Sequence, residues 1–346
     1  MGIQIRYKTI YGIRNKNLSL LAMGMILLVC FLASFAFGRY PVNPGDVLKI
    51  LLSRIVPIRP TWSREMETAV LNIRFPRICM ACAVGCALAA AGVSYQGVFQ
   101  NPMAAPDLLG ASGGAGFGAA LAIVMGFSSG AVVLCAFTAS ILTVVVVFLV
   151  AQRAQGKKAV NLILAGIMIG SLCTAGTSYL KLIADPGNQL PQITYWLMGS
   201  LSGVKNSDLP FTLCLMLAGL LPLFLLRWRI NLLTLGDEEA QSLGVNPNLL
   251  RLAIVLCSTL VTAAAVSVSG VIGWVGLVIP HICRKLVGSD YRFLMPASFL
   301  GGATFLLLVD GLSRNLFSVE LPVGILSAVI GAPFFLYLMC RKEKTL

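Results

Sequence analysis

Long apolar runs recur from one end of this chain to the other, and they constrain the fold more than any other feature of the sequence. Hydrophobic residues make up 58% of the 346 residues and charged residues only 11%, whereas a soluble domain carries roughly 25% charged residues. A run of about 20 apolar residues is the length that an α-helix needs to cross a bilayer. The chain is therefore predicted to be an all-α, polytopic membrane protein, and the composition argues strongly against a soluble enzyme.

The apolar runs divide residues 1–346 into a single domain with ten expected spans. Residues 1–17 form a basic tail, and the run after them is too long and too poor in cleavage signals to be a signal peptide. The 249–287 stretch is too long for one span, and the Ser267–Gly270 break predicts a hairpin of two helices. The expected spans cover residues 18–38, 77–99, 108–126, 130–151, 160–183, 208–227, 249–270, 272–287, 294–313 and 322–340.

Basic residues predict the orientation, because cytoplasmic loops of membrane proteins carry an excess of Lys and Arg. If the N-terminus lies inside, the short outside loops hold only Lys181, Lys205 and Arg314. Both termini are therefore expected in the cytoplasm. The inside segments then hold Arg6, Lys8, Arg14, Lys16, Arg153, Lys157, Lys158, Arg227, Arg229, Arg251, Arg284, Lys285, Arg292, Arg341, Lys342 and Lys344.

The extracytoplasmic segment 39–76 departs from this rule. It carries the bases Arg39, Lys49, Arg54, Arg59, Arg64 and Arg74, with Arg77 directly after it, against the acids Asp46, Glu65 and Glu67. One interpretation is that a long loop escapes the charge rule and its arginines reach lipid headgroups. The other is a docking surface for an acidic partner. Charge alone leaves both open.

The net charge and the glycine-rich stretch bear on whether the chain binds nucleic acid or a nucleotide. The net charge of +13 follows from topology and contact with anionic lipid, so no nucleic acid is expected. The glycine-rich stretch 110–118 lacks the Gly-Lys-Ser/Thr of a phosphate-binding loop and indicates close helix packing instead. No catalytic residues and no bound cofactor are predicted, and any ATP hydrolysis must come from another chain.

Several residues with metal-binding or proton chemistry need an interpretation. Cys79, Cys82 and Cys86 share one expected helix, but cysteine is also an ordinary small apolar residue in membranes, so no metal site is predicted. The single histidine, His281, follows Pro280 and is interpreted as a helix partner rather than a haem or metal ligand. Asp310 is expected to pair with Arg314, four residues later on the same helical face.

The 227–250 segment is amphipathic and lies on the inside. Its residues 228–248 predict a pair of short surface helices, with acids at 237–239 and a stop at Gly244. A helix lying on the membrane would bring these acids against anionic lipid. A soluble cytoplasmic partner fits the charges better.

Taken together, seven segments resemble the permease subunits of type II ABC importers, which take up iron–siderophore complexes, haem and vitamin B12. The resemblance spans nearly the whole chain and implies a homodimer in the prokaryotic cell (inner) membrane. It also implies two ATPase subunits inside, which use ATP and Mg, and a substrate-binding protein outside. The segments are IRFPR, GVFQNPMAAPDLLGASGGAGFG, NLILAGI, YWLMGSLSG, LGDEEAQSLGV, SGVIGWVGLVIPHICR and ELPVGILSAVIGAPFF.

The resemblance also assigns roles to particular residues. Arg74, Arg77 and Arg314 would receive glutamates of the binding protein. The cytoplasmic gate would comprise Asn101 and Met103, with a second part near Ala159 and Val160, where the vitamin B12 permease has hydroxyl residues. The coupling segment in the ATPase cleft would comprise Leu235, Gly236, Asp237, Glu238, Ala240, Leu243 and Gly244.

The expected cargo is a metal chelate, with iron–siderophore first because DPGNQLPQITYW resembles the iron-chelate branch. Vitamin B12, haem and molybdate remain alternatives. An ion-coupled secondary transporter would instead require intramembrane acids or broken helices with ion ligands. The sequence offers Asp310 alone for that role, and this acid has its own arginine.

Overall fold

A computed structural model describes residues 2–38, 40–54, 56–156, 158–316 and 318–340, and it describes the side chains from residue 15 to residue 337 and at 340 within those ranges. This part of the chain is 80% helical and contains no strand. Some basic side chains used to predict the orientation lie outside the described residues, namely Arg6, Lys8, Arg14, Arg39, Lys157, Arg341, Lys342 and Lys344.

Ten helices coincide with the ten expected apolar runs. Among the described residues, seven helices are long and apolar enough to cross a membrane, whereas α5, α12 and α14 are shorter. The ten are α1 (Gly2–Ala36), α4 (Phe75–Val98), α5 (Ala111–Val124), α6 (Ser129–Arg153), α7 (Lys158–Ile183), α9 (Leu209–Leu233), α11 (Pro247–Ser269), α12 (Val275–Val287), α13 (Tyr291–Asn315) and α14 (Val323–Cys340).

Shorter helical elements lie between the expected spans, and in 228–248 they differ from the predicted pair of short helices. Residues 2–17 of the expected tail form the first part of α1. The 228–248 segment holds the end of α9, one short helix and the start of α11 instead of a pair of short helices. Within the described residues 40–54 and 56–76, the chain forms two helices and a π-helical turn that leads straight into α4. These additional elements are α2 (Pro44–Leu52), α3 (Arg64–Thr68), η1 (Ala69–Arg74), η2 (Pro106–Leu109), α8 (Gln189–Leu197), η3 (Asn206–Asp208) and α10 (Asp237–Ser242).

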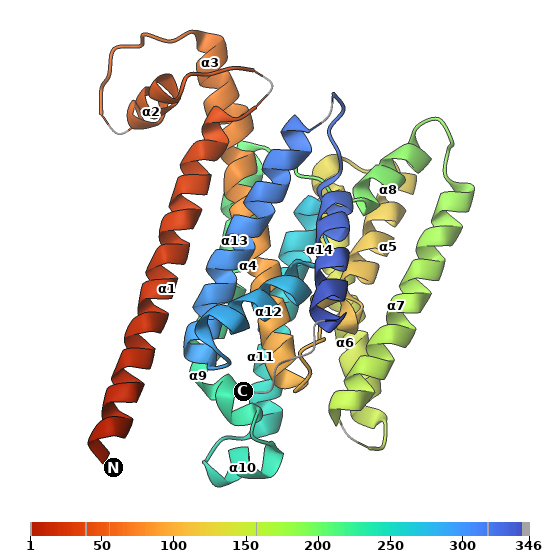
Figure 1. Ribbon diagram of the computed structural model, residues 1–346. Coiled ribbons are helices and arrows are strands. Elements are labelled where there is room, and N and C mark those ends of the chain that lie inside the picture. The colour runs from red at the N-terminus through yellow and green to blue at the C-terminus, as the bar shows by residue number, and fades with distance from the viewer. Residues whose placement is uncertain (1, 39, 55, 157, 317, 341–346) are drawn as a thin grey trace.

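The core forms around α4, which packs most extensively on α13 and also on α11 and α12 (Figure 1). In the most apolar 18-residue stretch of the helix that contains α4, 78% of the residues are buried. The corresponding values for the peripheral helices α1 and α7 are 11% and 17%. Glycines allow the close crossings: a Cβ on Gly85 would collide with the carbonyl of Gly302 on α13, and one on Gly92 with the carbonyl of Gly276 on α12. Small residues at crossings are typical of membrane helices, which associate through close packing.

The helix bundle has two distinct ends. Figure 1 shows α2, α3 and α8 at one end, and the start of α1 together with α10 at the other. The expected break after α11 is confirmed, because the helix stops at Ser269 and Gly270 takes a left-handed φ of 67°. Residues 270–274 are not helical, and α12 begins at Val275.

Candidate functional site

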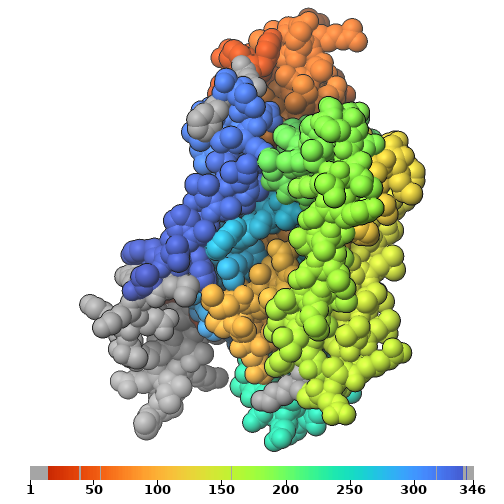
Figure 2. Space-filling model, turned by 90° about the vertical axis from the view of Figure 1, so that its right-hand side faces the viewer, coloured from red at the N-terminus to blue at the C-terminus, as the bar shows by residue number. Residues whose placement is uncertain are grey.

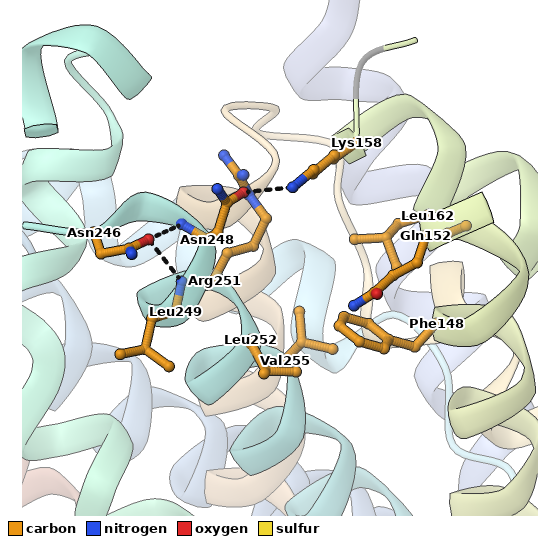
Figure 3. Close-up of a pocket in the computed structure, with 11 residues that line it drawn as sticks. Phe148, Gln152, Lys158, Leu162, Asn246, Asn248, Leu249, Arg251, Leu252 and Val255 are labelled. Atoms are coloured by element: carbon orange, nitrogen blue, oxygen red, sulfur yellow. Dashed lines mark hydrogen bonds between the residues drawn. The ribbon is translucent and has the colours of Figure 1, made fainter. Parts of the chain in front are cut away.

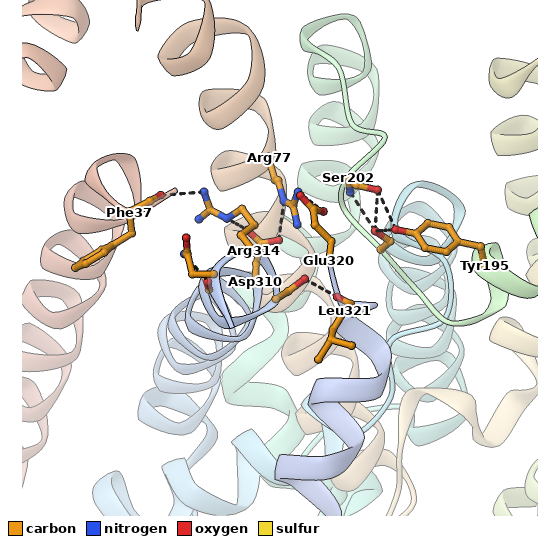
Figure 4. A network of polar contacts seen from close by, with 12 residues as sticks. Phe37, Arg77, Tyr195, Ser202, Asp310, Arg314, Glu320 and Leu321 are labelled. Carbon is orange, nitrogen blue, oxygen red and sulfur yellow. Dashed lines mark hydrogen bonds and ion pairs between the residues drawn. The ribbon is translucent and has the colours of Figure 1, made fainter. Parts of the chain in front are cut away.

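An ion-pair cluster lies at the end of the bundle that carries α2 and α3 (Figure 4). Arg77 Nε donates to Asp310 Oδ1 at 2.8 Å, and Arg77 Nη1 donates to Glu320 Oε2 at 2.9 Å. Arg314 Nε lies 3.1 Å from Asp310 Oδ2. The expected pairing of Asp310 with Arg314 is therefore present, and Arg77 on α4 is a further partner that the sequence did not predict.

Arg74, the last residue of η1, stabilises the end of α1. Its guanidinium donates to the backbone carbonyls of Phe35 and Tyr40. Phe35 lies in the last turn of α1, whose carbonyls lack intrahelical partners and carry partial negative charge, whereas Tyr40 lies beyond the helix. Gly38 makes room for this contact, because a Cβ there would lie 2.6 Å from Arg74 Nη2.

The three arginines expected to dock a partner are all buried. Arg74 is 5% exposed, and Arg77 and Arg314 are each 6% exposed. Asp310 is fully buried, whereas the Glu320 side chain keeps 30% of its surface exposed. The cluster thus offers a partner one accessible acid in front of guanidinium groups that already have carboxylate or carbonyl partners.

A hollow runs along one face of the molecule. Figure 2 shows it between the blue α14 and the green to yellow-green α7, with the cyan α12 and the orange segment after α4 at its floor. One cavity beside α7, of 310 Å³, lies between α5, α7 and the end of α8. Its lining is mainly small or hydroxyl-bearing, with one base: Ser112, Gly113, Gly116, Thr174, Thr177, Ser178, Lys181, Leu197 and Val271.

The expected gate residues lie at the end of the hollow that is nearer to α10. The segment after α4 is tightly turned: Gln100 has a φ of 50° and donates its side-chain amide to the carbonyl of Leu233 at 2.6 Å. Asn101 Oδ1 accepts a hydrogen bond from the backbone N–H of Met103 at 2.9 Å, and Met103 is 45% exposed. Ala159 and Val160 lie in the first turn of α7.

The expected coupling segment forms α10 and its flanking turns. Leu235 and Leu243 are 58% and 59% exposed, although both are apolar, whereas Ala240 is fully buried and can only support the helix from inside. Gly236 and Gly244 bound the helix with positive φ values of 127° and 80°. Arg251 Nη2 donates to Asp237 Oδ1 at 2.9 Å and ties α10 to α11, a contact that the sequence did not predict.

The cysteines of α4 and the histidine of α12 are the remaining candidate residues. Cys79, Cys82 and Cys86 lie along α4, and no group of three or more His, Cys, Asp or Glu residues that could hold a metal ion occurs among the described residues. The ring of His281 lies 6.3 Å from the ring of Phe335 on α14, in an edge-to-face arrangement. This contact joins α12 to α14 at the hollow.

The chain is thus an all-helical, multi-pass membrane protein with a hollow along one face (Figure 2) and exposed apolar side chains on the turns around α10. The sequence model of the FecCD transport family matches residues 26–341, and the chain belongs to this family of ABC-importer permeases of the prokaryotic inner membrane. Such permeases are transport components rather than catalytic ones.

Curated relatives carry different cargoes. The chain is 37% identical to the molybdate import system permease protein MolB of Haemophilus influenzae, over 94% of this chain and 96% of that protein. It is 42% identical to the hemin transport system permease protein HmuU of Yersinia pestis, over 83% and 88% of the two chains. A solved inward-facing structure of a metal-chelate type ABC transporter is similar with a TM-score of 0.83 and 36% identity, covering 92% of this chain and 98% of that one.

Proposed function

We propose that this chain is the membrane-spanning subunit through which an ATP-driven importer moves a metal chelate, most specifically an iron–siderophore complex. The observation that carries the proposal is the family match over residues 26–341, which includes all the helices around the hollow. The hollow would give the metal chelate a route past α7, α12 and α14.

The proposed topology has ten spans and two cytoplasmic termini, with 1–346 as one permease domain. Helices α5 and α12 have 14 and 13 residues, or about 21 and 20 Å at a rise of 1.5 Å per residue, less than the hydrocarbon thickness of about 30 Å. Non-helical backbone adjoins both helices, and such backbone is tolerated within a membrane where protein surrounds it. In this topology 1–17 and 228–248 lie inside, and 39–76 lies outside.

A second copy of the chain is the proposed partner at the hollow. The helices that flank it expose many apolar side chains, among them Leu164 and Met168 on α7 and Val329 and Leu336 on α14. Two copies related by a twofold axis would present the same surface to each other. The pathway would then lie between the two protomers, closed on the inside by Asn101, Met103, Ala159 and Val160.

Two ATPase subunits are the proposed cytoplasmic partners, and they rather than this chain would use ATP and Mg. The exposed Leu235 and Leu243 on either side of α10 support this role, because apolar side chains on an acidic surface favour burial in a protein cleft. Gly236, Asp237, Glu238, Ala240 and Gly244 would set the shape and charge of this segment.

The proposed outer partner is a substrate-binding protein with acidic docking residues. As the guanidinium groups of Arg74, Arg77 and Arg314 are buried, a partner carboxylate would first have to replace Glu320 beside Arg77. Glu320 is suited to such an exchange because it is the more exposed acid of the cluster. Its place directly before α14 would link docking to a helix of the pathway.

An iron–siderophore complex is the proposed cargo. The cavity beside α7 combines hydroxyl groups with the base Lys181, a lining that attracts an anionic chelate without holding it by many charged contacts. The relatives named for molybdate, hemin and cobalamin import make those cargoes the alternatives.

Uptake by the reconstituted importer tests the proposal. The chain would be assembled in liposomes with its ATPase and binding protein, and entry of radiolabelled ferric siderophore, hemin, cobalamin and molybdate would be compared. ATP-dependent accumulation of the ferric siderophore above the other three is the expected result. Accumulation of another cargo alone would overturn the substrate, and accumulation without ATP would overturn the importer class.

A further inference from the structure

A second cavity, of 310 Å³, lies away from the hollow, between α6, α7 and the start of α11 (Figure 3). Its lining is divided in two. Lys158, Asn246, Asn248 and Arg251 gather at one end, whereas mainly apolar side chains, with Gln152 as a polar residue among them, form the walls across the rest. These walls include Phe148, Ala151, Leu162, Leu252 and Val255.

The polar end is built to receive an anion. Lys158 Nζ donates to Asn248 Oδ1 at 3.2 Å and is brought toward the first turn of α11. Arg251 is 8% exposed, and its buried Nε has no hydrogen-bond partner, although Nη2 pairs with Asp237. The start of a 23-residue helix adds the partial positive charge of its backbone N–H groups.

We infer that this cavity binds an anionic phospholipid, with the phosphate at Lys158, Arg251 and the start of α11, and an acyl chain along the apolar walls. A free anion would gain nothing from those walls, whereas a lipid uses both ends of the cavity. The apolar Leu249 lies at the lining with 65% of its surface exposed, as expected where the cavity meets lipid. Basic pockets between helices at the cytoplasmic side of a membrane are typical sites for anionic headgroups.

The inference rests on the proposed topology for the leaflet that supplies the lipid, but not on the proposed cargo. Retention of lipid is measured on the full-length permease alone, so it can succeed or fail independently of uptake. If Lys158 proved accessible from the outer side of the membrane in a labelling experiment, the topology would be wrong while the binding result stood.

Native mass spectrometry of the full-length chain in detergent tests the site. The protein is incubated with phosphatidylglycerol, with phosphatidylcholine of the same acyl chains, or with inorganic phosphate. We expect phosphatidylglycerol to be retained in preference to phosphatidylcholine, and Lys158→Gln to weaken its binding about five-fold, the value of one basic residue near a membrane surface. Arg251→Gln should have at least that effect.

Arg229→Gln is the matched control, because Arg229 is exposed on α9 at the same end of the bundle and does not line the cavity. It should leave lipid retention unchanged. Lys158 is exposed, so its variant should fold even if Arg251→Gln does not. Equal retention by wild type and Lys158→Gln, equal retention of the two lipids, or binding of inorganic phosphate without lipid would each overturn the inference.

Discussion

Asp310 is fully buried between two arginines, and a single buried carboxylate therefore connects α4 with α13. Breaking a buried ion pair by removing one partner leaves an uncompensated charge, which typically costs about 3–5 kcal/mol. Glu320 adds a second acid to Arg77 from the segment before α14. The arginines proposed for docking therefore hold the fold together, and a test of the proposed docking must separate its effect from this structural role.

Glu320→Gln makes that separation. If a partner carboxylate replaces Glu320 beside Arg77, removing the competing charge should tighten binding of the substrate-binding protein about five-fold, as for loss of a partly exposed ion pair worth about 1 kcal/mol. The measurement is binding-protein affinity for the reconstituted importer.

The control is Glu67→Gln, which removes a partly exposed acid, paired with Arg54 and hydrogen-bonded to Trp62, at the same end of the molecule. An affinity gain in both variants would indicate a general charge effect. Unchanged or weaker binding by Glu320→Gln would show that Arg77 serves the fold alone.

The crossing of α4 and α13 depends on backbone contact at Gly85 and Gly302. We expect Gly302→Ala to destabilise the protein by about 1–3 kcal/mol, because the added methyl group must push two backbones apart. Gly311→Ala, on the same helix, is the matched control, since a Cβ there meets nothing within 4 Å. Thermal unfolding in detergent should show a lower midpoint for the first variant only, and equal midpoints would contradict the packing argument.

Asp290 ties the start of α13 to α9, accepting hydrogen bonds from Asn231 at 2.9 Å and from the backbone of Arg292 at 3.0 Å. Burial alone would raise its pKa, but the hydrogen bonds from Arg292 and Asn231 outweigh that effect and lower the pKa from 3.8 to about 2. A lowered pKa in the folded state stabilises the protein above the unfolded value of 3.8. That contribution is lost as the pH falls toward 2.

Asp290→Asn should therefore cost about 2 kcal/mol near neutral pH and progressively less below about pH 4. Unfolding of wild type and variant at several pH values measures the gap. Asp185→Asn serves as the control for loss of one acid in an exposed loop. A gap between wild type and Asp290→Asn that stays constant down to about pH 2 would contradict the assignment.

For the whole molecule, the sequence predicted the positions of the long helices better than the short helices between them and the ion pairs that join them. Apolar runs located ten helices because each run is long, and the break at Gly270 was visible in the composition. The helices α2, α3 and α8 were missed, since short segments outside the main runs carry weak periodic signals. Glu320 and Arg251 were missed as partners because their contacts join segments that are distant in sequence or depend on side-chain direction.

The coupling segment makes a prediction for the assembled importer. Leu243→Asp places a charge on the exposed apolar turn after α10 and should strongly reduce substrate-stimulated ATP hydrolysis and transport, while the permease still folds in membranes. Gln241→Asp adds the same charge at a neighbouring exposed polar position and should have a much smaller effect. Normal ATP hydrolysis and transport by Leu243→Asp would show that this turn does not contact the ATPase.

The unbroken helical stretch Arg64–Val98 has 35 residues, which amounts to about 52 Å at 1.5 Å per residue, against a hydrocarbon thickness of about 30 Å. More than one third of it must therefore stand clear of the hydrocarbon, and α2 packs beside its η1 turn. In the proposed topology this raised structure is an epitope on the outer surface. An antibody against residues 40–66 should label spheroplasts without permeabilisation. If it labels them only after permeabilisation, this segment lies inside and the proposed topology is wrong.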